Sequence, residues 1–332
     1  MSCLYVCEQG ATIGYESYRF QVKLNGKIIQ SVPGETVETI YLFGKIQLTT
    51  QCITKCLQRG VNVVFYSSFG SYYGRLISTN HVNVERQRLQ ASLSSDFKLE
   101  ITKNIIQAKI HNQAVILQRY SRYNIANIDD KISFLLLLSR KISSCETTES
   151  IMGYEGIAAK NYFYALGKLI NPDFKFSKRS RRPPLDPFNS MISLGYSIIL
   201  NEIYGKIDGK GLNPYFGIMH KDKEKHPTLA SDLMEEWRPV IVDSLTMSLL
   251  NGHELTIEDF YSVENRPGVF ITNAGFRTYI SKLENKLWTS NKYLTGIDYP
   301  VTFRQAMDLQ VNSFCKAIKK NNPSIYKAIQ IR

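Results

Sequence analysis

The segment QRLQASLSSDFKLEITKNIIQAKIHNQAVILQRY, residues 87–120, divides the chain into two parts of different character. Its apolar residues recur at helical spacing and predict one or two long helices. Before it, residues 1 to about 85 contain the short alternating runs that are typical of strands. After it, stretches of helical period continue toward the C-terminus. The sequence therefore predicts an α+β protein with a small N-terminal β domain of packed sheets, residues 1–85, and a larger all-α domain, residues 86–332.

The N-terminal part contains a strong hairpin signal. YRFQVKLNGKIIQSV, residues 18–32, has two alternating runs around Asn25-Gly26, a dipeptide that favours a two-residue turn. TTQCITKCLQRG, residues 49–60, predicts a short helix ended by Gly60. So small a β domain buries its apolar faces poorly by itself, and we therefore expect it to form a dimer interface. Further strands are expected in TIYLFG (39–44), VNVVFYS (61–67) and YYGRLIS (72–78).

The composition favours an anionic partner. The chain has 332 residues, a formal net charge of +12 and a sequence pI of about 9.3. Such a balance suits nucleic acid, or less often an acidic membrane, although it also occurs as plain solubility charge. The longest fully aliphatic run, Leu135–Leu138, is far shorter than the ~20 residues of a membrane span. No basic-then-apolar signal segment opens the chain, so we expect a cytoplasmic protein without membrane contact.

Most of the positive charge lies in the predicted helical part. Residues 1–80 hold 7 Lys/Arg and 4 Asp/Glu, whereas the remainder holds 34 and 25. A dense run that we call the basic loop is a candidate for contact with nucleic-acid phosphates, although such a run can also be only a solvated face. Arg238 is a weaker candidate, because it can pair with Glu235 or Glu236 instead. The basic loop consists of Lys178, Arg179, Arg181 and Arg182.

One predicted helix places an acid on its apolar face. In SIMGYEGIAAKNYFYAL, residues 150–166, Ile151, Ala158, Tyr162 and Leu166 share one side of the helix. Glu155 falls near the middle of that side. A carboxylate that faces a core is unfavourable unless it is paired, protonated or bound to a metal. An ordinary buried Arg or Tyr partner is one explanation, and a metal ion is the other.

Candidate partners for this acid occur in GLNPYFGIMHKDKEKHPTLASDLMEEWRPVIVD, residues 211–243. His220 ends an apolar run, and a helix is expected to begin at Pro227-Thr228. Asp232 and Glu235 are three residues apart on this helix and are therefore neighbours, which by itself is typical of a solvated flank. Together with Glu155, however, these residues form a histidine and carboxylate set that suits Mg²⁺ or Mn²⁺. With a basic surface, the set predicts metal-dependent phosphodiester chemistry on nucleic acid.

Four stretches, in this order, resemble the successive signatures of the CRISPR-associated protein one family, the integrase of the CRISPR adaptation module. They are YEGIAAKNYF, RRPPLDPFNSMISLGYSIIL, LNPYFGIMH and TLASDLMEEWRPVIVD, and the β-rich start of the chain is also similar. The resemblance implies an α-helical catalytic domain and a homodimer. It also implies DNA partners, namely a spacer precursor and the CRISPR repeat. Further implied partners are a small ferredoxin-like adaptation subunit and, optionally, an end-trimming nuclease.

The resemblance also implies roles for single residues. Glu155 corresponds to the family's first metal-binding acid, His220 to its metal-binding histidine, and Glu235 to its second metal-binding acid, which is often Asp in relatives. Asp232 corresponds to the acidic neighbour three residues before that second acid, and we expect it to be catalytic as an outer-shell or auxiliary group. The implied ion is Mg²⁺ or Mn²⁺. His226 has no metal role by this match, and we expect a loop histidine near phosphate.

Three functions remain open at this point. The first is an integrase, in which a 3′-hydroxyl of the incoming DNA attacks a phosphodiester of the repeat. The second is a metal-dependent nuclease for branched or single-stranded DNA, which uses water as the nucleophile at the same site. The third is a non-catalytic DNA-binding scaffold with a structural ion. Covalently lengthened DNA product distinguishes the first from the second, and metal-dependent turnover distinguishes both from the third.

Overall fold

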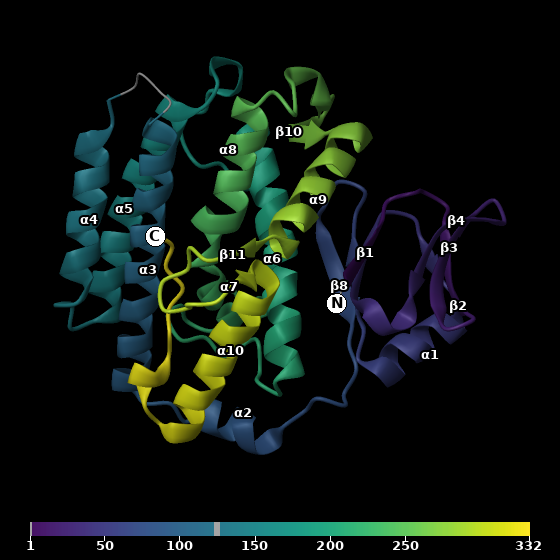
Figure 1. The fold of residues 1–332 in the computed structure, drawn as a ribbon, viewed down its shortest axis with the longest axis horizontal. Coiled ribbons are helices and arrows are strands. Elements are labelled where there is room, and N and C mark those ends of the chain that lie inside the picture. Colours follow the sequence, from purple (N-terminus) through teal and green to yellow (C-terminus); the bar gives the residue numbers. More distant parts are fainter. Residues whose placement is uncertain (1, 123–126) are drawn as a thin grey trace. The chain divides into compact units, whose positions relative to one another are not determined.

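A computed structural model describes residues 2–122 and 127–332 of the chain (Figure 1). The chain forms two compact units, Met1–Asn83 and Val84–Arg332, and the expected boundary was residue 85. The first unit is rich in strands, and the second is mostly helical, which confirms the predicted α+β class. In the described residues, no helix combines the length and the apolar composition that a membrane crossing requires.

The N-terminal unit contains two four-stranded sheets. In the first sheet β1, β5 and β7 run parallel, and β8 is antiparallel to β7. The second sheet is antiparallel through β4, β3 and β2, and β6 joins β2 in parallel. The strands of the first sheet are β1 (Ser2–Val6), β5 (Val37–Phe43), β7 (Asn62–Tyr66) and β8 (Tyr72–Leu76). Those of the second are β4 (Lys27–Pro33), β3 (Arg19–Leu24), β2 (Thr12–Glu16) and β6 (Gln47–Leu48).

Local sequence signals explain how this unit turns. Asn25 and Gly26 both have positive φ, at 50° and 76°, as the expected tight turn between β3 and β4 requires. Helix α1 (Thr50–Arg59) begins at the cap Thr49 and ends at Gly60, which has the left-handed conformation. The buried core includes Cys52 and Cys56 of α1 together with aliphatic side chains of both sheets. The predicted hairpin and the predicted short helix are thereby confirmed.

The second unit is built mainly from helices. The segment 87–120 forms two of them, because Ser94 caps the start of α3 with a hydrogen bond to the backbone N–H of Phe97. Two small two-stranded sheets, which the sequence did not predict, are formed by β9 (Phe260–Val263) with β10 (Arg266–Ile271) and by β11 (Ser290–Asn291) with β12 (Val301–Thr302). The helices are α2 (Val84–Ala91), α3 (Ser95–Ser121), α4 (Asp129–Ile142), α5 (Thr148–Leu169), α6 (Pro187–Gly209), α7 (Thr228–Met234), α8 (Ser244–Asn251), α9 (Asn273–Trp288) and α10 (Phe303–Lys320).

An irregular stretch follows α7. This helix ends at Met234, and a π-helical segment, η3 (Arg238–Asp243), leads into α8. The sequence explains the break, because Pro239 has no N–H to donate to the carbonyl of Glu235, four residues earlier, and its ring crowds that carbonyl. Glu235 therefore lies where regular helical geometry is interrupted.

We expect Lys286→Met in α9 to stabilise the chain at neutral pH. Burial, and to a smaller extent the charge of Arg119, lower the pKa of Lys286 from its ordinary 10.5 to about 8. The unfolded chain thus binds more protons than the native one between pH 8 and 10.5, so the penalty is complete below pH 8 and disappears as the pH rises to 10.5. The gain should be about 1–3 kcal/mol at pH 7 and should shrink through that window.

Chemical denaturation between pH 7 and 10.5 measures this gain. Lys282→Met, on the same helix, is the control, because Lys282 forms only an exposed ion pair with Glu254. A pH-independent gain, or one of equal size in the control, would contradict the expectation.

Candidate active site

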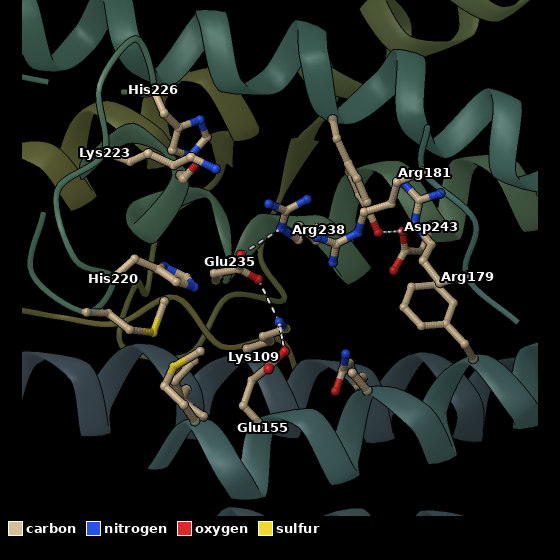
Figure 2. Close-up of a pocket in the computed structure, with 18 of the residues that line it drawn as sticks. Lys109, Glu155, Arg179, Arg181, His220, Lys223, His226, Glu235, Arg238 and Asp243 are labelled. Carbon is tan, nitrogen blue, oxygen red and sulfur yellow. Dashed lines mark hydrogen bonds and ion pairs between the residues drawn. The ribbon is translucent and has the colours of Figure 1, made fainter. Parts of the chain in front are cut away.

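A cavity of about 890 Å³ opens within the helical unit. Its walls come from α3, α5, α6, the basic loop, the segment between α6 and α7, and the irregular stretch after α7. Figure 2 shows Glu155, Glu235 and Lys109 near its middle, with His220 and His226 toward one end and Arg179, Arg181 and Asp243 toward the other. The lining thus combines acids and bases that are far apart in the sequence.

The centre of the cavity holds two carboxylates joined by an ammonium group. Lys109 Nζ lies 2.5 Å from Glu155 Oε1 and 2.6 Å from Glu235 Oε2 (Figure 2). Glu235 Oε1 lies 3.0 Å from Arg238 Nε. The side chains of Lys109 and Glu235 are each only 9% exposed, so water screens these charges weakly. The partner of Glu155 is therefore a lysine, whereas the sequence suggested an Arg or a Tyr as its ordinary partner.

These charges determine each other's protonation. Burial by itself would raise the pKa of Glu235, but Arg238 and Lys109 together lower it to about 2. Burial acts to lower the pKa of Lys109, and the charges of Glu235 and Glu155 outweigh it, so that this pKa is raised. Glu235 is therefore charged at neutral pH, and the ammonium of Lys109 beside it is charged as well.

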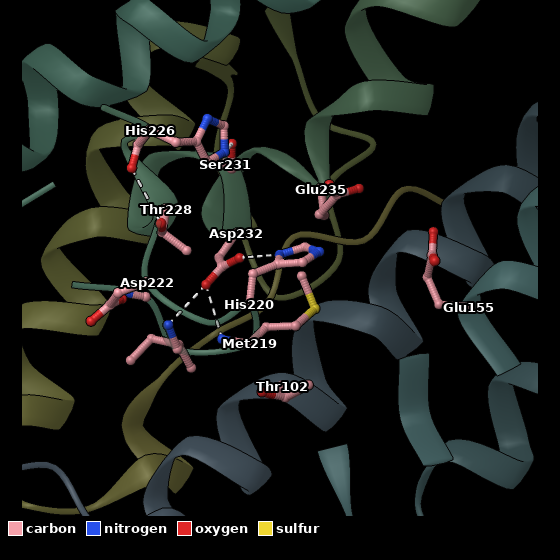
Figure 3. Close-up of polar contacts among 12 residues, drawn as sticks. Thr102, Glu155, Met219, His220, Asp222, His226, Thr228, Ser231, Asp232 and Glu235 are labelled. Carbon is pink, nitrogen blue, oxygen red and sulfur yellow. Dashed lines mark hydrogen bonds and ion pairs between the residues drawn. The ribbon is translucent and has the colours of Figure 1, made fainter. Parts of the chain in front are cut away.

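His220 is held from behind by a buried acid. Its Nδ1 lies 2.6 Å from Asp232 Oδ1, and Asp232 Oδ2 accepts hydrogen bonds from the backbone N–H groups of Ile218 and Met219 at 2.8 and 2.9 Å (Figure 3). Asp232 is fully buried, and its hydrogen bond raises the pKa of His220. Because Nδ1 faces Asp232, Nε2 is on the opposite edge of the ring, toward the cavity (Figure 2).

The acids after Pro227 are buried, whereas helical spacing alone suggested that they lie on a solvent-exposed flank of the helix. Asp232 and Glu236 are 0% exposed, and Glu235 is 7% exposed. The reason is long-range packing, since α3 and the C-terminal segment cover this part of the chain. Arg238 pairs with Glu235, which is one of the two partners that the sequence offered.

The donor types fit a hard divalent ion. Two carboxylates and one imidazole face the cavity, and such ligands suit Mg²⁺ or Mn²⁺. Glu235 Oε2 is buried, and its partner is the ammonium of Lys109 at 2.6 Å. A cation already lies between the two acids, although it is the ammonium of Lys109. In the described part of the chain, no three His, Cys, Asp or Glu side chains are close enough together to hold an ion as they stand.

The basic loop divides into two kinds of residue. Arg181 and Arg182 line the cavity and are exposed, and Lys178 is exposed outside its lining. Arg179 is half-buried, because its guanidinium donates to Asn189 Oδ1 at 2.8 Å and to Ser193 Oγ at 3.1 Å. Of the four predicted DNA contacts, Arg179 is thus the one with the most internal bonds.

Two arginines bracket one buried tyrosine. The guanidinium carbon lies 5.6 Å from the Tyr196 ring centroid for Arg179 and 4.4 Å for Arg238. The hydroxyl of Tyr196 donates to Asp243, and the hydroxyl of Tyr162 donates to the same carboxylate at 3.0 Å. Burial raises the pKa of Asp243 to about 6, although the hydrogen bonds of both tyrosines act to lower it.

Sequence analysis missed several lining residues. Lys109 had a local signal, since it is a single charge within the apolar run IIQAKIHNQAVIL, but nothing local identifies its partners. Asp243 also lines the cavity, and so do Lys221 and Lys223, two of the three lysines between His220 and His226. His226 lines it too, and its Nε2 lies 2.9 Å from Ser231 Oγ.

Comparison with known proteins now identifies the family. The family model described as "CRISPR associated protein Cas1" matches residues 4–285. The chain belongs to the Cas1 family. It is 33% identical over 323 residues to the "CRISPR-associated endonuclease Cas1" of Mycobacterium tuberculosis. This match covers 97% of this chain and 95% of that relative. It is also 31% identical over 265 residues to a "CRISPR-associated exonuclease Cas4/endonuclease Cas1 fusion" of Rhodospirillum rubrum. This match covers 77% of this chain and 46% of the fusion.

Solved structures show the same Cas1 fold. A "Casposase bound to integration product" has a TM-score of 0.84 and 22% identity, and the match covers 100% of this chain and 96% of the casposase. A chain of the "Cas6-RT-Cas1--Cas2 complex" has a TM-score of 0.83 and 24% identity, and the match covers 98% of this chain and 36% of the other. At such identities the similarity concerns the fold alone.

We expect Lys109→Met to destabilise the chain strongly in the absence of divalent ions. It leaves two poorly hydrated carboxylates facing each other without their ammonium, a change that costs about 3–5 kcal/mol for buried ion pairs. Millimolar Mg²⁺ or Mn²⁺ should restore part of this loss, because a divalent cation can replace the missing charge. Chemical denaturation in chelator and in each metal measures both effects.

Lys103→Met is the matched control for this experiment. Lys103 also belongs to α3, but it pairs with the exposed Glu100. Its loss should change stability by less than about 1 kcal/mol and should not respond to metal. The interpretation fails if Lys109→Met is no less stable than the control in chelator.

Proposed function

We propose that this Cas1-family chain is a metal-dependent DNA integrase of CRISPR adaptation. In the proposed reaction, the 3′-hydroxyl of a short spacer DNA attacks a phosphodiester of the CRISPR repeat, so that one ester bond forms as another breaks. The same site would also act as an endonuclease. The observation that carries the proposal is one cavity lined by Glu155, His220 and Glu235 on one part of its wall and by Arg181 and Arg182 on another.

Each side chain of the cavity has a role in this proposal. Glu155, Glu235 and His220 would hold Mg²⁺ or Mn²⁺, which when bound supplies a lowered pKa for the attacking hydroxyl and positive charge near the phosphodiester. Asp232 accepts a hydrogen bond from Nδ1–H of His220. This bond would orient the ring so that Nε2 faces the cavity as a ligand atom. The exposed part of the basic loop would contact DNA phosphates. Lys109 balances the acids when no ion is present.

The proposed partners are DNA, a second copy of the chain, and other adaptation proteins. The casposase structure with an integration product and the "Cas6-RT-Cas1--Cas2 complex" support partnership with DNA and with a Cas2 subunit, which we propose is the small, ferredoxin-like partner. The fusion of a relative to a Cas4 exonuclease supports an end-trimming nuclease as a further partner. Exposed Ile28 and Ile29 on the edge strand β4 support dimerisation through the N-terminal unit. A cytoplasmic location is part of the same proposal.

We expect Glu155→Ala, His220→Ala and Glu235→Ala each to lower strand transfer by at least about 100-fold. Ligands of one ion act as a unit, so each single change should be nearly as severe as the triple. Asp232→Asn keeps the shape of its buried site and should have a milder effect, about 10-fold. The assay joins a labelled short duplex to a supercoiled repeat-bearing plasmid, with Mn²⁺ and the small partner subunit.

The product distinguishes the possible activities. Lengthened plasmid strands indicate integration, strands that are only shortened indicate a nuclease, and no metal-dependent product at all indicates a scaffold. Circular dichroism verifies that each variant is folded. Integration near the wild-type rate by Glu155→Ala would contradict the proposed site.

Neutralising the exposed residues of the basic loop should weaken DNA binding without regard to sequence. In Lys178→Gln/Arg181→Gln/Arg182→Gln, each lost phosphate contact should reduce the slope of log K against log salt by about 0.9. Arg179 is kept, because its bonds to Asn189 and Ser193 support the fold. Fluorescence anisotropy of a labelled duplex between 50 and 300 mM salt, roughly the range where such slopes are measured, gives this value.

The control removes the same charge from another surface. The last turns of α10 carry three exposed lysines, Lys316, Lys319 and Lys320. Changing all three to Gln also lowers the net charge by three, so the long-range attraction to DNA should fall by roughly the same amount as in the loop variant. If the two triple variants lose equal slope, only net charge matters, and the basic loop has no specific contact.

A further inference from the structure

The backbone that carries Glu235 cannot hold itself in place by helical hydrogen bonds alone. Glu235 lies between the end of α7 at Met234 and the π-helical η3, and Pro239 cannot donate to its carbonyl. A side chain on such a stretch depends on outside contacts for its position, since regular bonding does not fix the local dihedral angles. The outside contacts come from α3 and from the C-terminal segment.

Gln310 of α10 bonds to residues on both sides of Glu235, to a backbone carbonyl before it and to a side chain after it. Its Nε2 donates to the carbonyl of Leu233 at 3.0 Å, and its Oε1 accepts from Trp237 Nε1 at 2.7 Å. Gln310 is 1% exposed and Trp237 is fully buried, so water does not compete with these bonds. One amide thereby fixes the residues two positions before and two positions after the acid.

The last residues of the chain hold the next residue, Glu236. We call Tyr326–Arg332 the C-terminal strap, and Figure 1 shows the C-terminal end of the chain beside α3. Glu236 Oε2 accepts from the backbone N–H of Ile329 at 2.5 Å, and Glu236 Oε1 accepts from the hydroxyl of Tyr326. The same hydroxyl also accepts from Gln310 Nε2 at 3.1 Å. The strap and Gln310 thus form one connected network around Glu235.

Helix α3 anchors the strap at the other side. Asn112 donates to the carbonyl of Glu236 at 3.0 Å and to that of Ile329 at 2.9 Å, and it accepts from the N–H of Ile331 at 3.0 Å. Asn112 is fully buried, and it lies three residues after Lys109 on the helix that also supplies the ammonium to Glu235. Helix α3 therefore contacts the side chain of Glu235 through Lys109 and the carbonyl of the following residue through Asn112.

We propose that the C-terminal strap and Gln310 position Glu235 for ion binding and catalysis, an inference that rests on the proposed function of that acid. These elements lie beyond residues 4–285, which the Cas1 family model matches. The site is therefore completed by a part of the chain outside the matched region. Groups that orient a metal ligand without touching the ion commonly change ion affinity or activity 10–100-fold when they are removed.

Tyr326→Phe tests the proposal with the loss of one oxygen atom. The ring stays packed edge-on against Phe314, but Glu236 and Gln310 both lose a partner. Hydrogen–deuterium exchange of the peptide spanning residues 228–243 should rise at least about 10-fold. Mn²⁺ affinity, measured by isothermal titration calorimetry, should fall about 10-fold, and kcat for strand transfer should fall while KM for DNA stays unchanged.

Tyr120→Phe is the matched control, since Tyr120 donates one partly buried hydrogen bond to the carbonyl of Ser244. Its exchange over 228–243, its Mn²⁺ affinity and its kcat should equal those of the wild type. Unchanged exchange over 228–243 in Tyr326→Phe would overturn the strap as a support of Glu235, whatever the chain does with metal. Increased exchange with wild-type Mn²⁺ affinity and kcat would also overturn it, because the strap would then be merely structural. A wild-type chain that binds no Mn²⁺ would instead refute the proposed function, while the exchange result still reports on the strap.

Discussion

The ammonium of Lys109 between Glu155 and Glu235 is the contact on which the rest of the helical unit depends. It joins α3, α5 and the irregular stretch after α7, three elements whose meeting residues are 46 and 80 positions apart in the chain. Bringing two acids and a lysine out of water is unfavourable, and only their mutual attraction at short distance offsets it. Any packing that separated these elements would leave a buried charge without a partner. The three elements are therefore held in one arrangement, and the acids that the site needs are brought together by folding itself.

The second constraint is Pro239, which prevents a regular helix from passing through Glu235. Natural chains often have such interruptions at functional sites, because an irregular backbone can direct a side chain where a helix could not. The irregularity is stable here because its polar groups have partners elsewhere. Gln310 satisfies the carbonyl of Leu233, and Asn112 satisfies that of Glu236. Polar bonds of this kind specify one geometry more strictly than apolar packing does, because each bond tolerates little change in distance or angle.

Local signals in the sequence predicted a large part of the fold. The hairpin at Asn25-Gly26 and the end of α1 at Gly60 follow from backbone preferences that neighbouring residues alone determine. The position of Glu155 among apolar residues followed from helical spacing in the same way, and it gave the first indication of a site. The family resemblance then gave the rest of the proposed ligand set.

Long-range contacts set the limit of that prediction. Lys109 could not be assigned to Glu155 and Glu235 from spacing, since no periodic pattern links three separate segments. Asp232 and Glu235 have the spacing of a solvated flank, and only the cover provided by distant elements makes them buried. In the two small sheets of the helical unit, β11 and β12 have two residues each, too few for an alternating pattern, and Pro267 and Gly268 interrupt the pattern of β10.

The balance of charge in the cavity also explains why an ion matters for DNA. The central cluster contains the side chains of two glutamates, one lysine and Arg238, so the formal charges of these four groups cancel. A neutral centre offers little attraction to a phosphodiester, even though Arg181 and Arg182 attract DNA to the same cavity. A divalent cation changes the centre from neutral to positive without any change in the protein's own charges. Under the proposed function, the basic residues would hold DNA in either state, whereas close approach of the reacting phosphate would be favoured only after the ion is bound.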